Sequence, residues 1–167
     1  MGKLKVGVFG WITVVIIALI GLSIWWSSKA KEAKTENQKE MSSRETALLC
    51  TTDMATQYHI HPELKIIING VEASIPPNLG IQPSCMTSIH THDEVGVIHV
   101  ESPVAKDFTL GDFFAVWKKD FSKDKILESI VALTTEIVVT MNGQKVDTYE
   151  NTILRDKDKI VISYQNK

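Results

Sequence analysis

Two copies of a strand, Asn-Gly, strand pattern constrain the fold of this 167-residue chain more than any other feature. Residues 64–69 (LKIIIN) are rich in β-branched side chains and precede Gly70, and residues 136–142 (EIVVTMN) precede Gly143 in the same way. Asn-Gly favours a tight hairpin turn because both residues tolerate a positive φ. The chain is therefore predicted to contain two β-hairpins, followed by a last strand at residues 159–164.

Helical signals occur before and between the hairpins. Residues 42–45 (SSRE) match a capping box, and residues 109–112 (TLGD) can cap a helix that continues with Phe113 and Phe114. Residues 122–133 carry apolar side chains at roughly helical spacing and predict a second short helix. Hairpin, helix and hairpin together predict an α+β fold with a small β-rich domain resembling a β-grasp fold, and an all-β sandwich is the alternative.

An uncharged apolar run extends from Val6 to Trp26. At about 1.5 Å per helical residue it is about 31 Å long, which matches a hydrocarbon core of about 30 Å. The run is longer than the apolar region of a cleaved signal peptide, and Trp25 and Trp26 suit a membrane interface. Residues 1–26 are thus predicted to be a single transmembrane helix, retained as a signal-anchor.

The remaining chain is predicted to be a polar stalk at residues 27–46 and a folded domain at residues 47–167. Residues 1–34 carry a net charge of +4 and residues 35–167 a net charge of -6. An acidic domain argues against nucleic acid as a partner, because phosphate binding requires a concentrated Lys/Arg surface. We expect a single-pass protein of the cell membrane whose domain lies on the extracytoplasmic side.

All five histidines fall within one stretch of the sequence. They form two His-x-His pairs and one isolated residue, and side chains at i and i+2 of a strand share a face. Neutral imidazoles are ligands for copper and zinc. A metal site is therefore predicted, with a hydrogen-bonded structural network or unrelated positions as alternatives. The predicted ligands are His59, His61, His90, His92 and His99, with Asp93 and Glu101 as carboxylates that orient the rings or complete the coordination.

Cys50 and Cys85 each precede one of the histidine pairs. A disulfide between them is predicted because two cysteines can pair in an oxidising compartment. Two inert buried thiols, or one thiolate acting as a metal ligand, are the alternatives.

Several short motifs together resemble a group of uncharacterised, membrane-anchored or secreted prokaryotic proteins. The resemblance covers about residues 50 to 120, and its most specific part is His-Thr-His-Asp at 90–93 followed by Ile-His-Val-Glu-Ser-Pro at 98–103. Tyr-His-Ile-His-Pro at 58–62 and Phe-Thr-Leu-Gly at 108–111 also belong to it. The resemblance implies that these segments form one unit, and it carries no established activity.

The resulting hypothesis is a membrane-tethered, extracytoplasmic metal-binding domain for copper or zinc, in metal handling or as a metal-bearing part of a membrane complex. The alternative is a non-catalytic accessory subunit of a larger membrane protein complex, with a structural histidine network. A zinc hydrolase would use three histidines and a carboxylate base. The sequence contains none of H-E-x-x-H, G-x-S-x-G or a phosphate-binding glycine loop, so we do not expect an enzyme.

Overall fold

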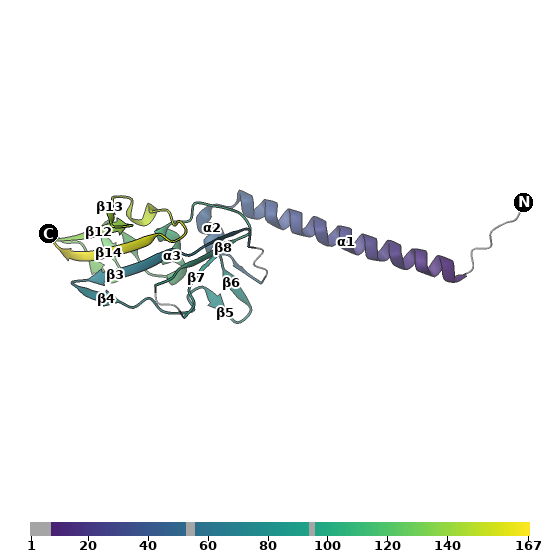
Figure 1. Ribbon diagram of the computed structural model, residues 1–167, viewed down its shortest axis with the longest axis horizontal. Helices are drawn as coiled ribbons and strands as arrows, with labels where there is room; N and C mark the ends of the chain where they lie inside the picture. Colours follow the sequence, from purple (N-terminus) through teal and green to yellow (C-terminus); the bar gives the residue numbers. More distant parts are fainter. Residues whose placement is uncertain (1–7, 53–55, 94–95) are drawn as a thin grey trace, which may run out of the picture. The chain divides into compact units, whose positions relative to one another are not determined.

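The computed structural model describes residues 8–52, 56–93 and 96–167, with side chains from Val15 onward except that of Gln38. The chain divides into two compact units, Met1–Glu40 and Met41–Lys167. Helix α1 belongs to the first unit, and all other elements belong to the second (Figure 1).

Helix α1 (Val8–Glu40) corrects the predicted membrane anchor. None of the helices in the described parts of the chain is long and apolar enough to cross a membrane. The transmembrane helix predicted over residues 1–26 is therefore wrong, and with it the membrane and signal-anchor assignments; residues 1–7 of that prediction lie outside the described residues.

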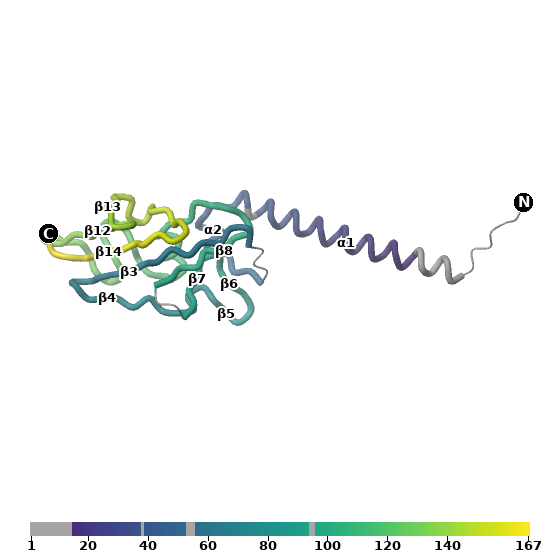
Figure 2. Tube along the Cα trace, viewed as in Figure 1, coloured from purple at the N-terminus to yellow at the C-terminus, as the bar shows by residue number. Residues whose placement is uncertain are grey.

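A five-stranded sheet of order β13-β12-β14-β3-β4 organises the second unit. Strand β3 (Glu63–Ile68) pairs with β4 (Val71–Ala73), and β12 (Thr135–Met141) pairs with β13 (Gln144–Val146), each antiparallel. The last strand, β14 (Lys159–Asn166), lies between the two hairpins, parallel to β3 and antiparallel to β12. Figure 2 shows β3 and β14 side by side, although most of the domain's sequence separates them.

The turns of both predicted hairpins are confirmed. Asn69 and Gly70 have φ values of 51° and 82°, and Asn142 and Gly143 have 54° and 81°. Positive φ at both positions is what a tight Asn-Gly turn requires, so the local sequence accounts for both turns.

The described residues also form three three-stranded sheets, two of which carry the histidines and cysteines. One has the order β2-β8-β7 and carries histidines, and the other has the order β1-β6-β5 and carries both cysteines. Their strands are β2 (Tyr58–Ile60), β8 (His99–Ser102), β7 (Ile89–His90), β1 (Cys50–Thr51), β6 (Cys85–Thr87) and β5 (Ile81–Gln82).

Helix α3 (Leu110–Trp117) confirms the helix expected after Thr109. The Thr109 hydroxyl accepts the Asp112 N–H, and the Asp112 carboxylate accepts the Thr109 N–H, which completes a capping box. Asp112 also pairs with Arg44 of helix α2 (Ser43–Leu48), whose own capping box begins at Ser42. The buried core around α3 includes Phe108, Phe113, Phe114, Ile66, Ile98, Val100, Leu154 and Ile162.

The helix predicted over residues 122–133 is wrong. This segment instead forms most of a sheet of three short antiparallel strands. A separate 3-10 turn occurs later, at Tyr149–Asn151. Leu127 has a φ of 51°, outside the helical region, and its N–H donates to the Asp120 carbonyl. Ile126 is fully buried whereas Ile130 is 66% exposed, so the apolar spacing does not mark one buried face. The strands are β9 (Phe121–Ser122), β10 (Lys125–Ile126) and β11 (Ser129–Ile130).

Candidate metal centre

The sheet β2-β8-β7 brings the five histidines together, with β8 in the middle. His59 on β2 pairs in register with Glu101 on β8, and His90 on β7 pairs with His99 on β8. Directly paired residues share a face of the sheet, as do residues two apart on one strand. His99 therefore lies between the two His-x-His pairs, whose first members are on the neighbouring strands and whose second members, His61 and His92, lie just past the strand ends.

Two groups of three histidines have the spacing of a metal site. In each group one ring nitrogen per residue lies within 4.8 Å of the others. The first group is His59, His61 and His99, and the second is His90, His92 and His99. We call them the β2 triad and the β7 triad. The described histidine clusters could thus hold a metal ion, and His99 belongs to both.

The ring positions show how closely the histidines pack. The His99 ring centroid lies 4.7 Å from that of His61 and 4.7 Å from that of His92, at interplanar angles of 89° and 82°. The His90 ring stacks on His99 at 5.5 Å and 16°.

The buried member of the cluster, His90, is held in one tautomer. Its Nδ1 lies 3.1 Å from the Thr87 carbonyl oxygen, which can only accept a hydrogen bond, so Nδ1 carries the proton and Nε2 carries the lone pair. Burial lowers the pKa of His90 to about 4, although the Thr87 carbonyl acts in the opposite direction. Nε2 is buried and has no hydrogen-bond partner in the part of the chain that the structure describes. At neutral pH this atom is an available ligand nitrogen.

Carboxylates lie next to the β2 triad. Glu101 Oε1 is 3.1 Å from His59 Nε2, and Asp156 Oδ1 is 3.8 Å from His61 Nδ1. Asp156 also accepts the backbone N–H of His61 at 3.0 Å, and this hydrogen bond is the main cause of its lowered pKa. Asp93, predicted to orient a ring, is exposed and belongs to neither triad.

Sequence reasoning missed Thr87 and Asp156. Asp156 is 95 residues from His61, and Thr87 acts through its backbone carbonyl, which any residue type supplies. The Asp156 contact depends on how distant segments dock. The Thr87 contact joins residues only three apart, but a backbone carbonyl leaves no signature in the sequence.

Two features hold the segment that leads to the β7 triad. Cys50 and Cys85 form the predicted disulfide, which joins β1 to β6 just before Thr87. The Thr91 hydroxyl donates to the Pro76 carbonyl and accepts the Leu79 N–H, which ties the second histidine pair to the proline-rich loop. Because both cysteines are in the disulfide, neither offers a thiolate as a metal ligand in this structure.

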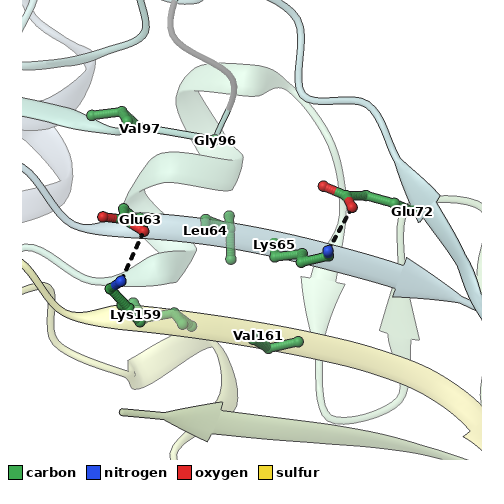
Figure 3. Close-up of a pocket in the computed structure, with 9 residues that line it drawn as sticks. Glu63, Leu64, Lys65, Glu72, Gly96, Val97, Lys159 and Val161 are labelled. Atoms are coloured by element: carbon green, nitrogen blue, oxygen red, sulfur yellow. Dashed lines mark ion pairs between the residues drawn. The ribbon is translucent and has the colours of Figure 1, made fainter. Parts of the chain in front are cut away.

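A surface groove of about 410 Å³ lies on the five-stranded sheet, with Gly96 and Val97 also in its lining (Figure 3). It is lined by charged residues of β3, β4 and β14, and Figure 3 shows Glu63 directed toward Lys159 and Lys65 toward Glu72. The N–O distances are 3.9 Å and 2.7 Å. Its lining contains no histidine, and its four charged residues form these two ion pairs.

Comparisons of the chain with protein-family models, with curated proteins and with solved structures found no match. The family resemblance suggested by the histidine motifs stays a prediction, and the chemistry of the site is argued from its geometry.

Proposed function

We propose that this protein binds copper or zinc through its histidine cluster, with the β7 triad of His90, His92 and His99 as the principal site. The observation that carries the proposal is the fixed tautomer of His90. A buried imidazole whose Nδ1–H donates to a backbone carbonyl presents Nε2 as a ligand, which is the arrangement that metal-binding histidines use.

The alternative of a purely structural histidine network has less support. A buried ring that serves as a structural hydrogen-bonding group uses both nitrogens. The described residues supply a partner for His90 Nδ1 and none for Nε2. A metal ion would satisfy this atom. The same ion would bind His92 and His99, because one ring nitrogen of each residue in the triad lies within 4.8 Å of the others.

The choice of ions follows from the ligand type. Imidazole nitrogen suits both copper and zinc, whereas magnesium and calcium prefer oxygen ligands. The disulfide supports an oxidising, extracytoplasmic compartment as the place of action. In that setting the proposed role is to hold or carry the ion, either alone or as the metal-bearing part of a larger protein complex.

The test uses the full-length chain without a histidine tag. Metal-free protein is exposed to Zn²⁺ or Cu²⁺, separated from free ions by gel filtration, and assayed by elemental analysis. We expect stoichiometric retention of at least one of the two ions. His92→Asn should reduce retention while preserving the fold, because His92 is exposed. Lys145→Ala, an exposed change on β13, is the matched control and should retain metal like the unmodified chain. Protein that retains neither ion would contradict the proposal.

A further inference from the structure

The position of His99 has a consequence for how many ions the cluster holds. We propose that the cluster binds two metal ions at once, one in each triad, and that the His99 ring bridges them. This inference rests on the proposed function, because it concerns the same histidines. It adds a second ion position and a specific role for one residue.

The strand order places His99 for such a role. Strand β8 is central, with β2, where the first histidine pair begins, on one side and β7, where the second pair begins, on the other. Adjacent strands lie about 4.8 Å apart, so the two pairs flank the His99 strand at the spacing of neighbouring strands. Ring nitrogens lie within 4.8 Å of one another in two groups of three histidines, and His99 belongs to both groups.

The chemistry of imidazole permits one ring to serve two ions. Its two nitrogens point in different directions, so each can bind a different ion. A neutral ring has one lone pair on nitrogen, and the other nitrogen carries a proton. When the second ion binds, that N–H bond breaks, the proton goes to solvent, and its electron pair forms the second nitrogen–metal bond. No oxidation or reduction accompanies the step, and release of protons is normal when metals bind.

Negative charge near the cluster lowers the electrostatic cost of a second ion. Two divalent ions on either side of a single ring repel each other, and the negative charge of the bridging imidazolate offsets part of that repulsion. The carboxylates of Glu101 and Asp156 lie beside His59 and His61 of the β2 triad. Negative charge is therefore located where the second cation would bind.

Titration of the full-length protein with Cu²⁺ tests the proposal, because Cu²⁺ has an unpaired electron. We expect elemental analysis to reach two copper ions per chain. The electron paramagnetic resonance signal should rise with the first equivalent and fall with the second, as the two spins couple through the bridging ring. His59→Asn, a change at an exposed residue of the β2 triad, should bind one ion and keep the full uncoupled signal.

The possible results separate this inference from the proposed function. One copper ion per chain, with a signal that persists at excess copper, would overturn the second position and leave the proposed function standing. Two ions with a full uncoupled signal would overturn the bridge. Protein that binds no copper and no zinc would overturn both. If His59→Asn still binds two coupled ions, the assignment of the β2 triad is wrong.

Discussion

His90 Nδ1 lies 3.1 Å from the backbone carbonyl oxygen of Thr87, and both residues are buried. This contact selects the tautomer that leaves His90 Nε2 as a ligand. The burial that creates the contact also disfavours the charged ring. The hydrogen bond to Thr87 thus sets the tautomer of His90, and burial keeps its ring neutral.

The first prediction concerns the pH dependence of stability in the metal-free protein. The pKa of His90 is lowered from 6.5 to about 4 in the folded state. Between these values the unfolded chain binds a proton that the folded chain does not, so the free energy of unfolding falls as pH falls from about 6.5 to about 4 and levels off below. This pKa shift corresponds to a change of about 3 kcal/mol in the free energy of unfolding. Urea denaturation of chelator-treated protein at a series of pH values measures it.

The control for the pH experiment is His90→Asn, which removes the titrating ring and keeps an N–H donor near Thr87. This variant should lose the part of the pH dependence due to His90, whatever its overall stability. An unchanged pH profile in His90→Asn would show that other groups cause the effect.

The second prediction concerns Gly80, which packs against the strand that holds His90. A Cβ added at Gly80 would lie 2.6 Å from the Ile89 carbonyl oxygen and would also clash with the Thr87 hydroxyl. Gly70 has a similar φ, 82° against 74°, but open space around it. Gly80→Ala should therefore cost about 1–3 kcal/mol more than Gly70→Ala, because only Gly80→Ala adds overpacking to backbone strain.

Chemical denaturation of the two alanine variants measures this difference. Gly80→Ala should also weaken metal binding, since the clash displaces Thr87 from His90, whereas Gly70→Ala should leave it unchanged. Equal losses of stability in both variants would show that only φ matters at Gly80.

The third prediction concerns Glu101, whose carboxylate lies 3.1 Å from His59 Nε2. Glu101→Gln keeps the shape and removes the charge that orients His59 and compensates a cation. Metal affinity of the β2 triad should fall by about 10- to 100-fold, as for other residues that hydrogen-bond to ligands. Competition titration against a coloured chelator measures this. Glu72→Gln, on an exposed carboxylate paired with Lys65, is the matched control, and an equal effect there would point to long-range charge alone.

The fourth prediction concerns the disulfide, which closes a loop with a sequence separation of 35. The loss of loop-closure entropy in the unfolded chain predicts that Cys50→Ala/Cys85→Ala costs about 4 kcal/mol. Reductant should destabilise the unmodified protein by a similar amount and leave the double variant unaffected. A cost under about 1 kcal/mol would mean that the unfolded chain is already constrained in this region.

Local signals in the sequence were reliable where a few neighbouring residues decide the conformation. Asn69-Gly70 and Asn142-Gly143 form their turns, and Thr109 and Asp112 cap α3, because positive φ and side-chain caps are satisfied within four residues. Apolar spacing was less reliable. It predicted a helix over residues 122–133 that the backbone at Leu127 excludes. The length of an uncharged apolar run likewise predicted a membrane span over residues 1–26 that the described helix does not support.

The sequence by itself determined the ligand supply: five histidines in two pairs and a single residue, and two cysteines placed before the pairs. Only the tertiary structure decided their arrangement. The pairing of β8 with both β2 and β7 made His99 common to two triads, brought Asp156 to His61 across 95 residues, and left Asp93 exposed one position after His92. The physical reason is that strand register and docking depend on burial of side chains far apart in the chain, which no short motif encodes.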